Sequence, residues 1–141
     1  MLKLSIACVA VLSATSICAE SGGVAHDLRE PHLVLYGAWW CAPCVAEYRD
    51  LPALVLAVRP ARIVLAWMDR PAPVPAGLSD HVESLPVGRA KLSASKHLGE
   101  GFGLPSAALV GASGALCHVW RERVRVAEVA RLVRSCRLRD R

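Results

Sequence analysis

Short runs of apolar residues, separated by polar and glycine-rich stretches, predict four β-strands. Residues 32–37 and 62–68 are almost continuously aliphatic, as the buried central strands of a parallel sheet are. Residues 106–110 and 115–120 flank a Gly-Ala-Ser-Gly sequence at 111–114, which predicts a β-hairpin. The pattern therefore places two strands in the first half of the chain and a hairpin near its end.

Segments with helix-like periodicity lie between and after these strands. Residues 45–58 favour a helix that stops before Arg59-Pro60, with a kink or a break at Pro52. Residues 90–98 form a second helical segment that is followed by glycine. A third spans residues 125–137 and has one apolar face, made of Val126, Val129, Ala130, Val133 and Cys136.

The stretch between the second strand and the second helix is less regular. Residues 71–77 are a proline-rich loop, and Ser79-Asp80 is expected to cap a short helix that ends at Leu85. Residues 85–87 are expected to be extended. Strand, helix and strand, followed by helix, hairpin and helix, predict an α/β three-layer sandwich with a mixed central sheet.

Composition fits one globular domain with an export signal in front of it. The chain has 141 residues, 54% hydrophobic and 21% charged. Residues 1–3 are a short basic start, residues 4–17 are apolar, and Cys18-Ala19-Glu20 follows. This predicts a signal peptide over 1–19, cleaved after Ala19, and a periplasmic or secreted domain over 20–141. The alternative is an uncleaved signal that tethers the protein to the membrane, although the apolar stretch is shorter than the ~20 residues of a spanning helix.

Positive charge is concentrated near the C-terminus. The formal net charge is +5, and eight arginines from Arg121 onward face only Glu122, Glu128 and Asp140. Such a segment docks an acidic partner or anionic lipid head groups, or is simply a solvated helix face and tail. No aromatic residues are interleaved with these arginines, so nucleic-acid binding is not expected.

Export would place the cysteines in an oxidising compartment. Of six cysteines, Cys8 and Cys18 would leave with the signal peptide, and Cys41, Cys44, Cys117 and Cys136 would remain. Cys117 and Cys136 do not form a second Cys-x-x-Cys pair, and the five histidines show no ligand spacing. Neither a metal nor a cofactor is expected, apart from a redox-active Cys41–Cys44 disulfide.

The sequence Trp40-Cys41-Ala42-Pro43-Cys44 carries the strongest chemical signal. It joins the first predicted strand to the first predicted helix, which puts Cys41 at a helix N-terminus. Unpaired N–H groups and the helix dipole stabilise a thiolate there, and a thiolate is the attacking species in disulfide exchange. A second thiol within reach resolves the mixed disulfide, so thiol–disulfide exchange is the predicted chemistry.

With Leu104-Pro105-Ser106 located before an apolar strand and a hairpin, residues 32–137 resemble the thioredoxin superfamily. The Trp-Cys-Ala-Pro-Cys sequence is similar to the active-site pattern of that family, and Leu104-Pro105 to its cis-proline segment. Glu47, three residues after Cys44, and the insertion over 71–87 resemble exported oxidoreductases of the TlpA/ResA/DsbE type. Many of those proteins keep the thiols of apocytochrome c or of copper-site proteins reduced.

The resemblance implies a role for each matching residue. Cys41 would be the nucleophile and Cys44 the buried resolving thiol. Pro105 would be cis, Leu104 would offer its backbone to an extended substrate, and Trp40 and Pro43 would support the rim of the site. Glu47 would tune the Cys44 proton directly or through a water, or would be an exposed helix carboxylate. Tyr36 and Trp39 are expected to be packing residues.

Two departures from the family pattern bear on the direction of the reaction. Leu35 stands where cytosolic thioredoxins have a buried Asp, which leaves Glu47 or water to accept the Cys44 proton. The Ala42-Pro43 dipeptide lacks the His of strongly oxidising members, which favours a reductase. Its expected partners are client proteins with reducible disulfides and a membrane electron donor, and the protein is expected to be a monomer. A disulfide oxidase or isomerase, and a redox-inert binding module, are the alternatives.

Cys117 and Cys136 are left over by this mechanism. Cys117 lies in the second strand of the predicted hairpin, and Cys136 on the apolar face of the closing helix. A disulfide between them and a pair of free, buried thiols are both compatible with the sequence.

Overall fold

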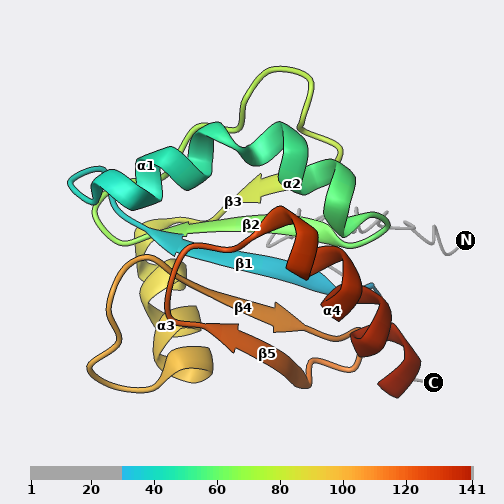
Figure 1. The fold of residues 1–141 in the computed structure, drawn as a ribbon. Coiled ribbons are helices and arrows are strands. Elements are labelled where there is room, and N and C mark those ends of the chain that lie inside the picture. Colours follow the sequence, from blue (N-terminus) through green and yellow to red (C-terminus); the bar gives the residue numbers. More distant parts are fainter. Residues whose placement is uncertain (1–29, 141) are drawn as a thin grey trace, which may run out of the picture.

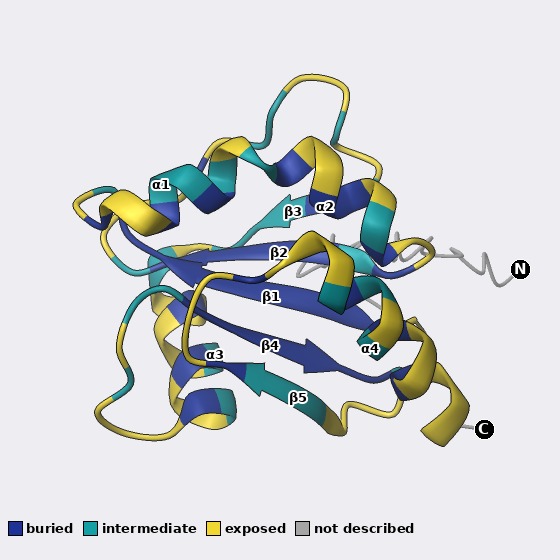
Figure 2. Ribbon diagram, viewed as in Figure 1, coloured by how far each residue is buried: buried dark blue, intermediate teal, exposed yellow. Residues whose placement is uncertain are grey.

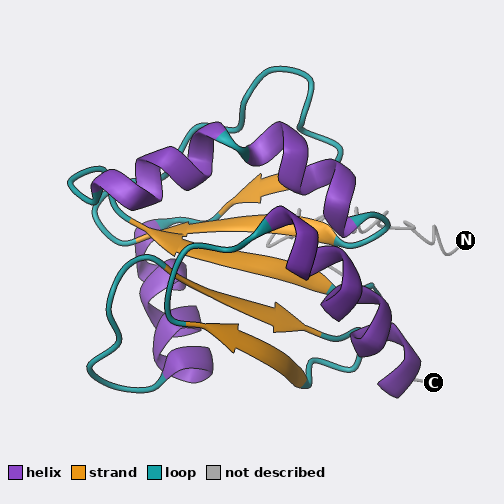
Figure 3. Cartoon of the chain, in the orientation of Figure 1, coloured by secondary structure: helices purple, strands orange, loops and turns teal. Residues whose placement is uncertain are grey.

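A five-stranded mixed sheet is the centre of the computed structural model, which describes residues 30–140. The strand order is β3-β2-β1-β4-β5, with β1 parallel to β2, β2 parallel to β3, and both β1–β4 and β4–β5 antiparallel (Figures 1 and 3). The strands span β1 His32–Gly37, β2 Arg62–Trp67, β3 Val82–Ser84, β4 Ser106–Val110 and β5 Leu116–Trp120.

Helices cover both faces of this sheet, which confirms the predicted α/β sandwich. Helices α1, α2 and α4 lie on one face, and α3 lies on the other (Figure 1). Their bounds are α1 Ala42–Arg49, α2 Leu51–Val58, α3 Val87–Leu98 and α4 Val126–Arg139. None of the helices within residues 30–140 is both long and apolar enough to cross a membrane.

The predicted break at Pro52 is confirmed. Helix α1 ends at Arg49, and α2 begins at Leu51 with Pro52 in its first turn. A proline in that place loses no intrahelical hydrogen bond, because the first N–H groups of a helix have no partner within it. The break lets α1 carry the Cys-x-x-Cys sequence while α2 packs its own apolar face on the sheet.

The predicted helix over 79–85 is wrong. Residues 82–84 are instead the edge strand β3, paired in parallel with β2, and Val82 is buried in the core. Backbone pairing with β2 and burial of Val82 outweigh the local capping preference of Ser79-Asp80. Val87 was also expected to be extended, but it is the first residue of α3. The predicted signal peptide over 1–19 lies outside the described residues.

Alternate residues of each strand point to opposite faces, and the two faces are packed differently. The face under α2 and α4 is built from large side chains, among them Leu33, Leu65 and Trp67. The side chains on the face under α3 are mostly smaller, such as Ala66 and Ala108, although Tyr36 also lies there, and α3 packs on them through Ala90 and Ala94. Figure 2 shows the central strands β1, β2 and β4 as the buried layer between the two helical layers.

Candidate redox-active site

Cys41 and Cys44 form a disulfide at the N-terminus of α1, with a Cα–Cα distance of 5.3 Å. Cys41 is the N-cap residue, and the backbone N–H of Cys44 donates a hydrogen bond to the Cys41 Sγ at 3.3 Å. Pro43 lies in the first helical turn, where its missing N–H costs nothing. The Cys41 sulfur therefore already accepts one of the orphan helix N–H groups, which is the arrangement that favours a thiolate after reduction.

Gly37 packs tightly directly before the active-site loop. A Cβ on Gly37 would lie 3.1 Å from the Cβ of Cys44 and 3.1 Å from the ring of Trp67. A larger residue would need these two side chains to shift by a few tenths of an ångström. The strand thus enters the loop in direct contact with the second cysteine.

The loop from β1 to α1 is held by an aromatic cluster. The rings of Trp39 and Trp67 are 4.2 Å apart, and Tyr48 packs edge-on against both. The N–H of Trp39 donates to the Asp69 carboxylate at 3.0 Å, and Arg70 lies 5.1 Å from the centre of the Trp39 ring. Tyr36 and Trp39 are packing residues, as the sequence predicts, and Tyr36 is fully buried on the α3 side.

Leu104 packs against the disulfide. Trp40, the residue before Cys41, is exposed to solvent. Leu104 packs on the cluster of Ala38, Cys41 and Cys44, whereas Trp40 is 73% exposed. The Leu104–Pro105 peptide bond is cis. The Ser106 hydroxyl donates to the Gly103 carbonyl at 2.7 Å, which fixes the turn that precedes β4.

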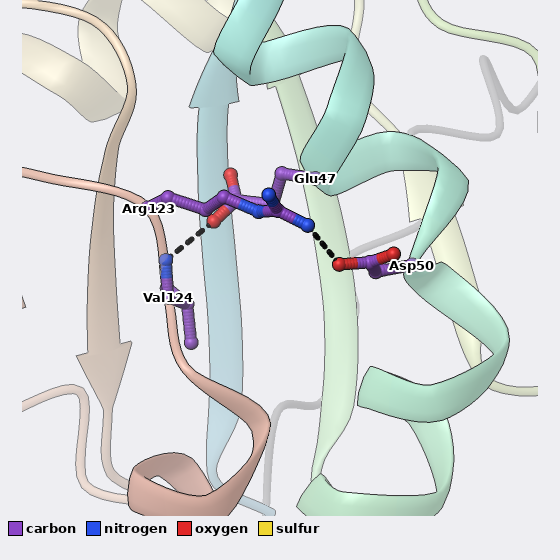
Figure 4. Close-up of polar contacts among 4 residues, drawn as sticks. All are labelled: Glu47, Asp50, Arg123 and Val124. Atoms are coloured by element: carbon purple, nitrogen blue, oxygen red, sulfur yellow. Dashed lines mark hydrogen bonds and ion pairs between the residues drawn. The ribbon is translucent and has the colours of Figure 1, made fainter.

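Glu47 is buried rather than exposed on the helix surface. The side chain is 3% exposed, and its Oε1 accepts a hydrogen bond from the Val124 N–H at 2.7 Å (Figure 4). Burial raises the pKa of Glu47 to about 7, against the lowering effects of the Val124 hydrogen bond and the nearby Arg123. Arg123 itself forms an ion pair with Asp50 at the surface (Figure 4).

Glu47 and Cys44 line a common small cavity. Its volume is about 10 Å³, at the lower limit for one water molecule. Leu35 lines the same cavity. It is the strand residue at the position where cytosolic thioredoxins have a buried Asp, so β1 supplies no carboxylate from that position. Tyr36 and Tyr48 line it as well, but the Tyr36 hydroxyl is on the α3 side of the sheet, where it contacts Ser93 and His97. Glu47 is thus the cavity's titratable group near neutral pH.

The fold matches solved structures of disulfide-exchange proteins. DsbF from Mycobacterium tuberculosis has a TM-score of 0.55 and 20% sequence identity, over 76% of this chain and 81% of that one. A thioredoxin-family thiol:disulfide interchange protein from Chlorobium tepidum has a TM-score of 0.53 and 19% identity, over 78% and 81% of the two chains. The chain has a thioredoxin fold. A DsbF homologue from Corynebacterium diphtheriae is also similar, with a TM-score of 0.54 and 15% identity over 76% and 72%. No protein-family model matches the sequence, and no curated protein matches it.

Within this thioredoxin fold, the residues singled out from the sequence converge on one end of the sheet. Cys41, Cys44 and Leu104 are in contact, and Glu47 reaches the same place from one turn further along α1. Sequence reasoning missed Asp69 and Val124, which hold Trp39 and Glu47. Asp69 follows β2 closely, and the carboxyl ends of parallel strands meet at one edge, so its position was a usable signal. Val124 acts through its backbone and gives no such signal.

A second disulfide joins Cys117 of β5 to Cys136 of α4, with a Cα–Cα distance of 5.6 Å. This resolves the alternative that the sequence left open, in favour of a bridge. Among residues 30–140, no group of three or more His, Cys, Asp or Glu side chains is arranged to hold a metal ion.

Proposed function

We propose that this protein is an exported thiol–disulfide oxidoreductase that reduces disulfides of client proteins through Cys41 and Cys44. The observation that carries the proposal is the Cys41–Cys44 disulfide at a helix N-terminus, with the Cys44 N–H already bonded to the Cys41 sulfur. A cysteine in this setting has a lowered pKa and is the better nucleophile of the pair. The thioredoxin fold of exchange proteins supports the same reaction class.

The reaction transfers two electrons from the dithiol to the client. The Cys41 thiolate attacks one client sulfur, breaks the client disulfide and forms a mixed disulfide, and the released client thiolate takes a proton. The Cys44 thiol then loses its proton and attacks the Cys41 sulfur. The second client thiolate leaves and is protonated, so the products are a client dithiol and the Cys41–Cys44 disulfide. An exported or membrane-bound dithiol donor restores the reduced form.

Glu47 is the proposed acceptor of the Cys44 proton, directly or through one water. It shares the small cavity with Cys44, and its pKa of about 7 lies close to working pH, where a general base is most effective. Leu104 and Pro105 are proposed to present backbone groups to an extended client segment, supported by Trp40 and Pro43 at the rim. The exposed indole of Trp40 offers apolar surface for such a segment.

The residues between the cysteines support the proposed direction of the reaction. Ala42 and Pro43 provide no cationic side chain to hold the Cys41 thiolate, whereas a His there would make the pair more oxidising. We therefore propose a reductase that receives electrons from a membrane donor and is directed out of the cytoplasm by residues 1–19.

The reduction potential of the Cys41–Cys44 pair tests this proposal. Equilibration with glutathione buffers, read by trapping free thiols with a maleimide, gives the potential directly. A value below about −220 mV supports a reductase. A value near −120 mV would instead make the protein an oxidase, and a pair that fails to exchange with glutathione would make it a redox-inert binding module.

A further inference from the structure

A cavity on the α3 side of the sheet is not part of the redox site. It has a volume of about 350 Å³ and is lined by residues of α3 and of the strands β1, β2, β3 and β4. Neither Cys41 nor Cys44 lines it. A volume of this size is within the range of small-molecule sites, which start at about 300 Å³.

The apolar part of the cavity comes mainly from buried strand residues. Val34, Val64 and Val110 belong to neighbouring strands β1, β2 and β4, and all face the α3 side. Leu85 and Leu92 add further aliphatic surface, and Leu92 is 73% exposed. The cavity therefore has an aliphatic lining and at least one edge that reaches solvent.

The polar part of the cavity is mostly cationic or hydrogen-bonding. Arg89 and Lys96, both on α3, line it, and neither forms an ion pair with any residue of the described chain. His32 and His97 line it as well, and Glu83 is the one carboxylate among the lining residues that the structure describes. Among the described lining residues, the formal charge at neutral pH is thus two cations against one anion, and burial lowers the pKa of both imidazoles, which favours their neutral form.

One imidazole has unused hydrogen-bonding capacity. The side chain of His32 is only 6% exposed; the Glu30 backbone forms a hydrogen bond with the ring that raises its pKa against the larger lowering by burial, but Nδ1 has no partner of good hydrogen-bond geometry among the described residues. A buried polar atom without a partner is costly, and such an atom in the wall of a cavity is suited to a polar ligand group. His97 is anchored differently, because its Nδ1 lies 2.7 Å from the Tyr36 hydroxyl, which in turn contacts Ser93 at 2.8 Å.

We propose that this cavity binds an aliphatic monocarboxylate of medium chain length, with the chain on the valine and leucine surface and the carboxylate near Arg89 and Lys96. A phosphate-bearing ligand fits less well, because the first residues of α3, Val87 and Gly88, do not line the cavity and offer it no helix N-terminal amides. The proposal does not depend on the redox chemistry of Cys41 and Cys44.

Titration calorimetry with sodium decanoate, on the purified oxidised protein, tests the proposal. Saturable binding with one site per chain is expected. Shortening the probe to octanoate should weaken binding about fourfold for each CH₂ group removed, as burial of aliphatic chain requires. Decylammonium, which has the same chain and the opposite charge, should bind at least tenfold more weakly than decanoate.

Matched variants of α3 locate the binding. The double variant Arg89→Gln/Lys96→Gln should weaken decanoate binding at least tenfold. Lys91→Gln, an exposed position of the same helix that does not line the cavity, should change it less than twofold. All three substitutions are at the surface of the helix, so circular dichroism should show unchanged folding. Histidine ring shifts in NMR spectra should move for His32 and His97 when decanoate is added.

Several results would overturn the proposal. Absence of saturation, a stoichiometry well above one, or equal weakening by Lys91→Gln would each show non-specific association. Decylammonium binding as tightly as decanoate would remove the role of the cations. Size-exclusion chromatography with light scattering tests a further alternative. If decanoate does not bind, and a dimeric parent protein becomes monomeric in Arg89→Gln/Lys96→Gln, the cavity face of α3 is an interface between copies of this chain.

Discussion

The two disulfides of this chain occupy opposite structural settings. Cys41 and Cys44 are three residues apart at one helix end, whereas Cys117 and Cys136 are 19 residues apart and join β5 to α4. A disulfide stabilises mainly by closing a loop in the unfolded chain, so the first contributes little in this way and the second contributes more. By loop length, the Cys41–Cys44 disulfide is suited to exchange and the Cys117–Cys136 disulfide is suited to stabilising the fold.

The surroundings of the two disulfides differ in the same sense. Cys41 accepts a helix N–H, and Cys44 shares a cavity with the titratable Glu47. Cys136 is fully buried in the main core. Around Cys117, the carbonyl oxygen accepts a hydrogen bond from Arg139, and Asp140 binds the N–H of Ala112 in the β4–β5 turn. These contacts fasten the end of α4 to the hairpin beside the second disulfide.

The largest expected effect is on exchange itself. Cys41→Ser should reduce disulfide exchange with an insulin substrate more than 100-fold, because the nucleophile is lost. Cys44→Ser should keep the attack but block the release, so mixed disulfides with client proteins accumulate on non-reducing gels. Equal capture of clients by both variants would show that the roles of the two cysteines are wrongly assigned.

Loss of the second disulfide should affect stability and leave exchange intact. The double variant Cys117→Ala/Cys136→Ala opens a loop of about 20 residues, so the free energy of unfolding in urea should fall by about 3 kcal/mol. Exchange activity should stay within twofold of the parent protein.

The single variant Cys136→Ala is the matched control for this experiment, because it also breaks the bridge. It should lose about as much stability as the double variant. A large loss of exchange activity in either variant would mean that the two disulfides do not act separately.

The contrast between the disulfides was visible in the sequence only in part. The Cys41–Cys44 site could be predicted because strand, loop and helix start are all local features of residues 32–58. The aliphatic strands and the break at Pro52 were predictable for the same reason. The Cys117–Cys136 bridge stayed open, since its geometry depends on how α4 crosses the sheet.

The misplaced and missed features depend on long-range pairing. β3 forms because its backbone pairs with β2 and Val82 enters the core, and neither is encoded by Ser79-Asp80. The burial of Glu47 depends on a hydrogen bond to Val124, 77 residues away in the chain. A helix surface position that looks exposed in the sequence becomes buried once the segment before α4 lies over it.

Glu47 should make the stability of the protein depend on pH. Burial raises its pKa to about 7 in the folded protein, whereas in the unfolded chain the carboxyl titrates near 4.5. Between pH 4.5 and pH 7, Glu47 therefore keeps its proton in the folded state but loses it in the unfolded state. The contribution of Glu47 to the free energy of unfolding should be fully present below pH 4.5 and fall by roughly 3 kcal/mol as the pH rises through 7.

Glu47→Gln isolates this effect. The amide oxygen of Gln can keep the hydrogen bond from the Val124 N–H, but it does not titrate. Urea unfolding at pH 4.5 and pH 7.5 should show a smaller pH dependence in the variant than in the parent protein. An identical pH dependence in the two proteins would show that Glu47 does not titrate in this range, and would remove the basis for its role as proton acceptor.

The smallest expected effect concerns Arg123, which lies between the surface and the redox site. Arg123 and Asp50 are both substantially exposed, so Arg123→Gln should change the free energy of unfolding at pH 7 by less than about 1 kcal/mol. Burial, which raises the pKa of Glu47, and the Val124 hydrogen bond, which lowers it, have the larger influences. The guanidinium of Arg123 lowers this pKa further. Its removal should raise that pKa and move the pH dependence of stability to higher pH. Arg125→Gln, at a nearby exposed position, is the control and should leave the pH dependence of stability unchanged. A shift of equal size in Arg125→Gln would show that general surface charge, and not Arg123 specifically, acts on Glu47 beside the Cys41–Cys44 pair.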